Sequence, residues 1–396
     1  MSEKTIQLKS ELSLELNSIL KYWSTKTIDT KNGGFIGQID ADENQLFATE
    51  KGSVLHARIL WTFSAAFQTT NNKEHKELAT RAFEFLSTYF YDAEFGGLFW
   101  SINADCSPKD TKNQIYALAF AIYGLSEYYK ISSNEKALSI AKNLYLKIQK
   151  YSYDPINSGY LEAFTRDWQP IDDLRLSDKD ANEKKTMNTH LHIVEAYANL
   201  YQVWQDETLR NDTVELLNTI ETHFINRETG HLHLFFDENW IEKPDVISYG
   251  HDIEAAWLLL QCSEITENKE LIKSYTQHAL KMAEATQEGI DTDGGLWYEF
   301  DPEANELIAE KHWWVQAEAL IGFYNAYQLT NDQKYLDLVL NNWNFIKKYI
   351  LDAKNGEWFW GINGDYSLIK KDKAGFWKCP YHNSRACLEL INRIKN

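Results

Sequence analysis

The sequence predicts an all-α fold, an (α/α)6 barrel of six helical hairpins with short β-hairpin connections. A turn motif recurs six times at intervals of roughly 60–70 residues, two stretches of helical periodicity lie between successive copies, and further helical stretches begin and end the chain. Such repeats bury their apolar faces against one another, so the first helix can pair with the last and close a ring. Length alone suggests two or three domains, but the repeat favours one domain over residues 1–396. An open solenoid is the alternative.

Each copy of the turn motif has an Asp or Asn, then three or four residues, then Gly and an apolar or aromatic run. The last glycines of the six copies are Gly34, Gly97, Gly159, Gly230, Gly295 and Gly356. A second polar turn follows six or seven residues later, which predicts a short hairpin. The Asp/Asn–Gly spacing suits a helix C-terminus that turns into this hairpin.

The helical stretches are of two kinds. Those that follow a hairpin are the less charged, and those in 52–70, 112–130 and 250–265 are apolar nearly all round, which predicts an inner ring buried on both sides. They cover 52–70, 112–130, 184–205, 250–265, 312–329 and 379–394. Their partners are amphipathic and should form an outer ring. These cover 6–24, 75–91, 134–150, 208–226, 269–287 and 332–351.

Charge and composition restrict the partners. The net charge is −18, with 40 Lys+Arg against 58 Asp+Glu, so neither a nucleic acid nor an anionic membrane surface is expected. A neutral small molecule fits better. The chain has no apolar run near 18 residues and no apolar signal core at its start. Four cysteines form no CxxC pair, which favours reduced thiols and a cytoplasmic location. The aromatic content of 14% suits either sugar stacking or helix packing.

Unusual polar and aromatic residues occupy the first turns of the predicted inner helices. They are Arg58, Tyr116, Asn188, His190, His192, His251, Glu254, Trp313, Trp314, Tyr381, His382 and Arg385. One buried histidine is usually only hydrogen-bonded in a core. Sets at equivalent positions in six repeats instead predict a pocket on the common axis, where the inner helices begin.

The spacing of the histidines narrows the chemistry. His251 and Glu254 are three apart and share a helix face, where a carboxylate can fix the tautomer of an imidazole. His190 and His192 are about 200° apart on a helix, so only one can face the pocket. Proton abstraction beside a carbonyl needs a base with a pKa near 7, which histidine has. Two histidines on opposite faces of one carbon would cause epimerisation, and a nearby Arg could stabilise the enediolate oxygen.

Other chemistries remain open from the residues alone. Glycoside hydrolysis needs two carboxylates, and Asp180, Asp252 and Glu254 are available. The sequence HLH occurs at 190–192 and 231–233, but three or four converging ligands are not apparent, so no metal site is expected. No strand-embedded GxGxxG is present to hold a nicotinamide. A sugar-binding or partner-binding protein without catalysis is a further possibility.

Several segments resemble a known family. The segments 187–197, 249–259, 311–320 and 376–389, with 52–64 near the front, are similar to signature segments of cellobiose 2-epimerases, within the N-acylglucosamine 2-epimerase superfamily. The resemblance spans most of the chain, and the motifs occur in the same order. Members of that family are (α/α)6 barrels, in agreement with the repeats.

The resemblance implies five catalytic residues. His251 and His382 resemble the acid/base pair at C2 of the sugar, and His192 resembles a group that assists ring opening. Arg58 resembles the cation beside the enediolate. Glu254 resembles the residue that orients the catalytic machinery.

The resemblance also implies a substrate site. Tyr116 and Asn188 resemble hydroxyl-binding residues, Trp314 and Trp377 resemble platforms for two sugar rings, and Asp180 could reach the distal sugar. The implied activity is reversible C2 epimerisation of the reducing-end glucose of β-1,4-linked disaccharides, cellobiose and also lactose, without metal or organic cofactor. An aldose–ketose isomerase or an N-acylglucosamine 2-epimerase is the nearer alternative, and an (α/α)6 glycoside hydrolase the more remote one. A monomer or weak dimer is expected.

Overall fold

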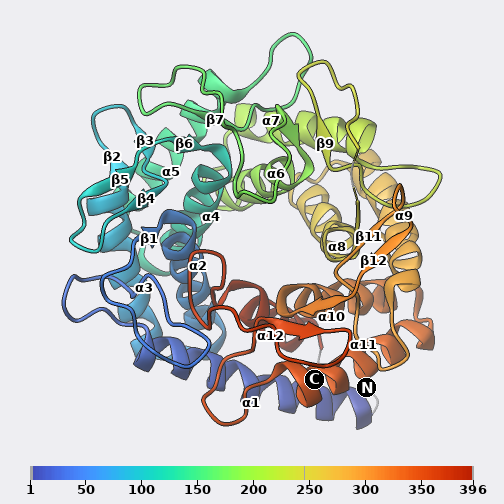
Figure 1. Ribbon diagram of the computed structural model, residues 1–396. Coiled ribbons are helices and arrows are strands. Elements are labelled where there is room, and N and C mark those ends of the chain that lie inside the picture. Colours follow the sequence, from blue (N-terminus) through green and yellow to red (C-terminus); the bar gives the residue numbers. More distant parts are fainter. Residues whose placement is uncertain (1–2, 245, 395–396) are drawn as a thin grey trace.

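Twelve α-helices form two concentric rings in the computed structural model, which describes residues 3–244 and 246–394 (Figure 1). The inner ring consists of α2 (Ser53–Thr70), α4 (Ile115–Ser132), α6 (Met187–Val203), α8 (Tyr249–Ile265), α10 (Trp313–Thr330) and α12 (Tyr381–Arg393). The outer ring consists of α1 (Glu3–Lys26), α3 (Lys73–Phe85), α5 (Glu135–Lys147), α7 (Glu207–Thr219), α9 (Lys269–Ala285) and α11 (Gln333–Phe345).

The inner ring is closed. Each inner helix contacts the next, and α12 contacts α10, α2 and the first helix of the chain, α1. The first and last helices accordingly lie side by side, and Nζ of Lys9 donates a hydrogen bond of 2.7 Å to the carbonyl of Ile394. This arrangement confirms the predicted (α/α)6 barrel and excludes the open solenoid.

The two kinds of helix differ in the way that the sequence predicts. Of the first fourteen residues of α2, Ser53–Ala66, all are buried except Ala65, because neighbouring inner helices cover both sides. The outer helix α11 buries only one stripe of its surface. Five outer helices begin at an Asn or Asp whose side chain accepts a hydrogen bond from a backbone N–H of the first turn. These caps are Asn72, Asn134, Asp206, Asn268 and Asp332.

A tightened or widened last turn ends five of the outer helices and leads into the turn motif. These turns are η1 (Leu86–Phe90), η2 (Ile148–Ser152), η3 (Ile220–Phe224), η4 (Thr286–Gly289) and η5 (Ile346–Ile350). A residue one or two positions after the end of each outer helix and its last turn pairs with a residue one or two positions after the motif's glycine. The six pairs are Ile28–Phe35, Tyr91–Leu98, Tyr153–Tyr160, Ile225–Leu232, Ile290–Leu296 and Leu351–Trp358. Gly159, with φ +78°, shows why glycine stands there, since a Cβ would lie 2.6 Å from Trp240.

Short antiparallel strands connect each repeat to the next. The residues before an inner helix pair with the hairpin of the following repeat, and Ile39 pairs with Ala374 where the ring closes. The strand pairs are β1 (Lys51–Gly52) with β4 (Ser101–Ile102), β6 (Asn113–Gln114) with β7 (Ala163–Phe164), β8 (Lys185–Thr186) with β9 (Phe235–Phe236), β10 (Ile247–Ser248) with β11 (Glu299–Asp301), and β13 (Glu310–His312) with β14 (Gly361–Asn363). The other strands are β2 (Tyr91–Asp92), β3 (Gly97–Leu98), β5 (Pro108–Asp110) and β12 (Glu306–Ile308).

The Asp of the turn motif has a structural role. In four repeats it accepts a hydrogen bond from a buried lysine that precedes the next inner helix. The pairs are Lys51–Asp29 at 2.7 Å, Lys185–Asp154 at 2.8 Å, Lys311–Asp291 at 2.7 Å and Lys373–Asp352 at 2.9 Å. Removing one partner of a buried pair leaves an uncompensated charge, which typically costs about 3–5 kcal/mol. These ion pairs therefore hold each hairpin against the start of an inner helix.

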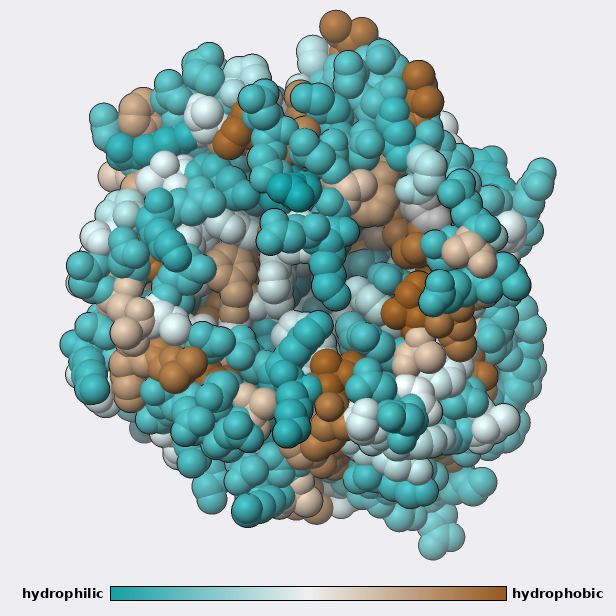
Figure 2. Space-filling model, in the orientation of Figure 1, coloured by the Kyte–Doolittle hydropathy of each residue, from teal (hydrophilic) through white to brown (hydrophobic). Residues whose placement is uncertain are grey.

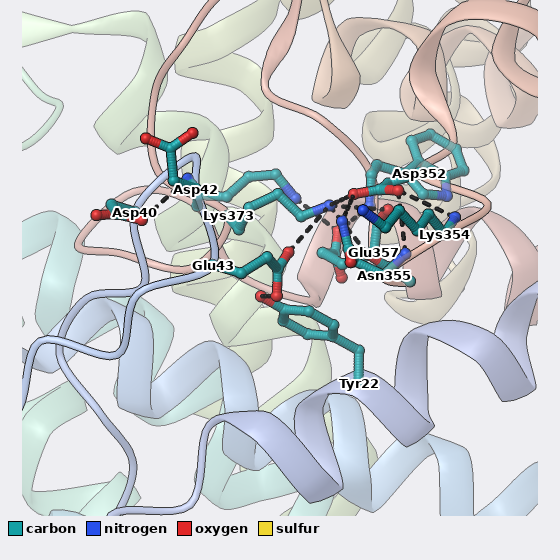
Figure 3. A network of polar contacts seen from close by, with 12 residues as sticks. Tyr22, Asp40, Asp42, Glu43, Asp352, Lys354, Asn355, Glu357 and Lys373 are labelled. Carbon is teal, nitrogen blue, oxygen red and sulfur yellow. Dashed lines mark hydrogen bonds and ion pairs between the residues drawn. The ribbon is translucent and has the colours of Figure 1, made fainter.

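The seam where the ring closes also carries a network of polar contacts, shown in Figure 3. Lys373 contacts Asp352 and also lies 3.7 Å from Glu43. Glu43 in turn accepts a hydrogen bond of 3.2 Å from the hydroxyl of Tyr22, on the first helix. The network thus joins the first and last repeats through polar contacts as well as through helix packing.

The face in Figure 2 is mostly hydrophilic and is hollowed near the barrel axis, where less polar side chains become visible. None of the helices within the described ranges is long and apolar enough to cross a membrane.

Candidate active site

A cavity of about 390 Å³ lies on the barrel axis at the end where the inner helices begin. All ten site residues expected from the sequence line it: Arg58, Tyr116, Asp180, Asn188, His192, His251, Glu254, Trp314, Trp377 and His382. Eight further residues complete the lining: Leu176, Ser177, Lys179, Tyr298, His312, Trp313, Trp360 and Lys371. We refer to this space as the catalytic cavity.

His382, in the first turn of α12, is held by a carboxylate of another inner helix. Its Nδ1 lies 2.7 Å from Oε1 of Glu318 in α10. Burial lowers the pKa of His382 well below its usual value, and the charge of Glu254 acts in the opposite direction. With Nδ1 donating to the carboxylate, the neutral ring has Nε2 free to accept a proton.

His251, in the first turn of α8, has a hydroxyl as its partner. Its Nδ1 lies 2.8 Å from Oγ of Ser248. Burial lowers the pKa of His251 to about 4, and the charge of Glu254 opposes that shift. The sequence suggested Glu254 as the orienting partner because of its i, i+3 spacing, but its Oε1 accepts a hydrogen bond of 2.5 Å from Arg385. Glu254 therefore acts on His251 through its charge.

Only one histidine of the 190–192 pair faces the cavity, as the helical spacing predicts. His192 lines it, with Nδ1 2.9 Å from Oε2 of Glu195. His190 points toward the neighbouring hairpin, where its Nε2 accepts a hydrogen bond of 2.9 Å from the backbone N–H of Tyr160. His190 is therefore a structural residue.

A single guanidinium joins the carboxylates of this site. Arg385 donates to Glu195 at 2.7 Å, to Glu254 at 2.5 Å and to Glu318 at 2.6 Å. Burial alone would raise the pKa of Glu195, but Arg385 and His192 together lower it to about 2. Arg385 thus fixes the carboxylates that in turn hold His192 and His382.

Among the described residues, Glu254, Glu318 and His382 form the one group whose ligand atoms lie close enough to hold a metal ion, all within 4.8 Å. Arg385 already bonds both carboxylates of this group and supplies the compensating positive charge. The donor set therefore fits a guanidinium better than a metal ion.

Arg58 differs from Arg385 because no described carboxylate forms an ion pair with it. One Nη of Arg58 donates a hydrogen bond of 2.7 Å to the hydroxyl of Tyr116, and the guanidinium lies 4.1 Å from the ring centre of Phe120. The Nε of Arg58 has no hydrogen-bond partner. Only 3% of Arg58 is exposed. A buried cation without a counter-ion is suited to an anion that forms in the cavity. The N-termini of the surrounding inner helices favour negative charge at the same place.

The groups expected to bind sugar lie around these charges. The ring of Trp314 lies 4.9 Å from His251 and 5.7 Å from His382, between centroids. Trp377 packs near Tyr116 at 6.1 Å. The buried Oδ1 of Asn188 has no hydrogen-bond partner and can accept one from a sugar hydroxyl.

Asp180 lines the cavity and also stabilises a local turn. One oxygen of its carboxylate accepts hydrogen bonds from the N–H and Oγ of Ser177, at 2.7 and 2.8 Å. This turn brings Asp180, Ser177 and Lys179 to the cavity from the long segment between β7 and β8.

Two further candidates from the sequence lie outside the cavity. Asp252 points away from it, and its carboxylate lies 2.7 Å from Nδ1 of His231. His233 pairs with a different carboxylate, Glu242, at 2.6 Å. The two histidines of the second HLH sequence therefore contact different carboxylates, and Asp252 is not available as one of two carboxylates that flank a glycosidic bond.

The sequence did not reveal the partners that hold the histidines. Glu195 could have been found, because it follows His192 at the same i, i+3 spacing that singled out His251 and Glu254. Glu318 is 64 residues from His382 in sequence and belongs to another helix, so no local pattern connects them.

Comparison with known proteins shows the family of this chain. The family model for N-acylglucosamine 2-epimerase (GlcNAc 2-epimerase) matches residues 34–386. The chain belongs to this family. It is 46% identical over 386 residues to the cellobiose 2-epimerase of Bacteroides fragilis, covering 97% of this chain and 98% of that relative. It is 38% identical over 387 residues to the cellobiose 2-epimerase of Ruminococcus albus, with 97% and 98% covered.

A solved structure of a cellobiose 2-epimerase is similar to this chain over nearly its whole length. The chain superposes on cellobiose 2-epimerase from Bacillus thermoamylovorans B4167 with a TM-score of 0.94 and 37% identity, covering 98% of this chain and 99% of that one. The resemblance inferred from the sequence segments is thereby confirmed, and the protein is an isomerase of the epimerase type.

Proposed function

We propose that the protein epimerises C2 of the reducing-end glucose in β-1,4-linked disaccharides, converting cellobiose to glucosyl-mannose and also lactose to epilactose. The observation that carries this proposal is the pairing of two histidines across one cavity. His251 and His382 belong to different inner helices, both contact the ring of Trp314, and burial lowers the pKa of both. Full-length relatives named cellobiose 2-epimerase support the choice of substrate.

The reaction begins with opening of the reducing-end ring, which His192 assists. One histidine of the pair then takes the proton from C2 with its free Nε2. The electrons of the C2–H bond form the C1–C2 double bond, and the C1 oxygen becomes the enediolate anion beside Arg58. The other histidine, which carries a proton, delivers it to the opposite face of C2 and the C1 carbonyl forms again. After turnover the two histidines have exchanged protonation states.

Glu254 has a definite part in this scheme. Burial favours the neutral form of both histidines, whereas the charge of Glu254 raises the pKa of both. The negative charge of Glu254 thus partly offsets the cost of protonating whichever histidine takes the proton from C2. Arg385 fixes Glu254 in place.

Substrate positioning uses the remaining lining residues. Trp314 lies beside the two histidines and is proposed to stack on the reacting sugar, while Trp377 and Asp180 are proposed to contact the distal sugar. Asn188 and Tyr116 supply hydrogen bonds to hydroxyls. The histidines and Arg58 provide the base, the acid and the cation, so the proposed reaction uses no metal ion or organic cofactor.

The test is product analysis after incubation with cellobiose and lactose. We expect glucosyl-mannose and epilactose as main products. Formation of the ketose alone would favour an aldose–ketose isomerase, and conversion of N-acylglucosamine but of neither disaccharide would favour an N-acylglucosamine 2-epimerase. Release of free monosaccharides would identify a glycoside hydrolase. Each of these three results would contradict the proposal.

We also propose a cytoplasmic location and a monomeric or weakly dimeric state. The four cysteines are all free thiols and three of them are buried, which suits a reducing compartment. Sedimentation of the purified protein tests the state of assembly, and fractionation of cells tests the location.

A further inference from the structure

A second cavity, of about 210 Å³, lies on the barrel axis at the end opposite the catalytic cavity. The second halves of five inner helices line it, α2, α4, α6, α8 and α12. They contribute among others Trp61, Tyr123, Glu195, Gln261 and Asn392. We call this space the lower cavity.

The charged groups of the lower cavity are compensated within the protein. Glu127 pairs with Lys130 at 2.8 Å, and Glu389 pairs with Arg393 at 2.8 Å. Glu195 is held by the guanidinium described above. No charge remains for an ion to neutralise, so the cavity suits a neutral ligand.

The uncharged groups, by contrast, retain hydrogen-bonding capacity. The rings of Trp61 and Tyr123 stack at 5.3 Å with an angle of 13°. Among the described residues, the Tyr123 hydroxyl and the Gln261 amide have no hydrogen-bond partner, and the buried indole N–H of Trp61 has none either. Stacked aromatic rings combined with unpaired donors and acceptors are what a polyhydroxylated ligand requires.

The size of the cavity limits the ligand. Its volume is about half that of the catalytic cavity, about 210 against about 390 Å³. The catalytic cavity is assigned to a disaccharide, so the lower cavity has room for one sugar ring. This comparison of sizes rests on the proposed function.

Glu195 connects the two cavities. It lines the lower cavity, and its Oε2 holds Nδ1 of His192 at 2.9 Å. Its Oε1 accepts a hydrogen bond of 2.7 Å from the hydroxyl of Tyr381, whose ring packs edge-on against Trp61 at 5.2 Å. An occupant that contacts Trp61 or Glu195 therefore acts on a carboxylate that orients His192.

We propose that the lower cavity is a second, non-catalytic site for one neutral sugar ring, and that its occupant lowers turnover through Glu195 and His192.

Binding is tested by calorimetry with 1,5-anhydroglucitol, a cyclic sugar analogue that cannot ring-open and is not turned over. The catalytic cavity is first filled with cellobiitol, the unreactive reduced disaccharide. We expect one remaining site for anhydroglucitol. The double variant Tyr123→Phe/Gln261→Leu keeps the aromatic stack but removes two polar partners, and should weaken this binding about tenfold or more. Trp377→Ala, in the catalytic cavity, should leave it unchanged.

Absence of binding once cellobiitol is bound, or equal binding to the double variant, would overturn the proposal. Failure of the proposed function has a different signature, because cellobiitol itself would then not bind. Anhydroglucitol is in that case titrated alone, and the comparison of the double variant with Trp377→Ala still identifies its cavity. The second measurement is kcat at saturating cellobiose. It should fall on addition of anhydroglucitol in the parent and not in the double variant, and binding without any change in kcat would refute the connection through Glu195.

Discussion

Replacement of Glu318 by Gln tests how His382 is oriented. Glu318 does not line the catalytic cavity, yet its Oε1 accepts from both His382 and Arg385, and its Oε2 accepts a hydrogen bond of 3.1 Å from the indole N–H of Trp257. A glutamine has one acceptor oxygen and one NH2 group. If the amide oxygen keeps the contacts to His382 and Arg385, the NH2 group faces the indole N–H of Trp257, and two donors meet. If the amide group rotates by 180°, the oxygen accepts from Trp257 and His382 loses its acceptor.

The expected loss of stability follows from these contacts. Hydrogen bonds to a charged acceptor contribute about 1.5–3 kcal/mol and neutral ones about 0.5–1.5 kcal/mol, so the free energy of unfolding should fall by about 1–3 kcal/mol. Arg385 keeps Glu195 and Glu254 as counter-ions, so the variant should fold. Loss of one correctly oriented acid/base should lower kcat for cellobiose by about 10²-fold. KM should change little, because Glu318 does not touch the substrate.

The assay is steady-state product formation from cellobiose, with denaturant unfolding as the measure of stability. Glu221→Gln is a matched control, since Glu221 contacts His278 at 3.1 Å on the outside of the barrel. That variant should retain full activity. A folded Glu318→Gln protein with kcat within about threefold of the parent would refute the idea that this carboxylate orients the base.

Three further predictions concern binding, pH and metals. Trp377→Ala should reduce kcat/KM for cellobiose more than for glucose, because a ring stacked on the distal sugar contributes only when that sugar is present; equal losses would place Trp377 at the reacting ring. Burial lowers the pKa of His56 and His190 to about 3, whereas an unfolded histidine has a pKa of about 6.5. Between these values the unfolded chain binds more protons than the folded protein. The free energy of unfolding should therefore fall as the pH decreases from 6.5 toward 3. Denaturant titrations should show a loss of about 2 kcal/mol per histidine between pH 6.5 and 5, and a flat profile there would contradict it. Activity should survive exhaustive chelation with EDTA, and a loss restored by one added metal would show that the acid/base groups are insufficient.

The architecture was accessible from the sequence because it is repeated. Six copies of one turn motif and helices that are apolar on all sides predict a ring without any knowledge of distant contacts. The lysines that bind the motif's Asp residues were not predicted. Lys51 and Lys373 precede inner helices in ordinary polar contexts, and their burial becomes apparent only when the hairpin of the same repeat folds over them.

The site was predictable to a different extent. Inner helices all begin at one end of the barrel, so the eight expected residues in their first turns had to converge. They do line one cavity, together with Asp180 and Trp377 from the segments that precede α6 and α12. Hydrogen-bond partners were harder to infer. Periodicity gives the face of a helix, but the choice between Ser248 and Glu254 as the partner of His251 depends on side-chain rotamers and on Arg385 from α12. Asp252, next to His251 in sequence, points the other way for the same helical reason.

The central claim, that two histidines serve opposite faces of C2, is tested most directly by the fate of the C2 hydrogen in D₂O. The proton removed stays on one imidazole, while the proton delivered comes from the other, which exchanges with solvent once the site opens. Proton NMR of the C2 signal should therefore show deuterium in the epimerised disaccharide, and starting disaccharide recovered early should carry much less. Full retention of protium at C2 of the product would contradict the two-histidine mechanism.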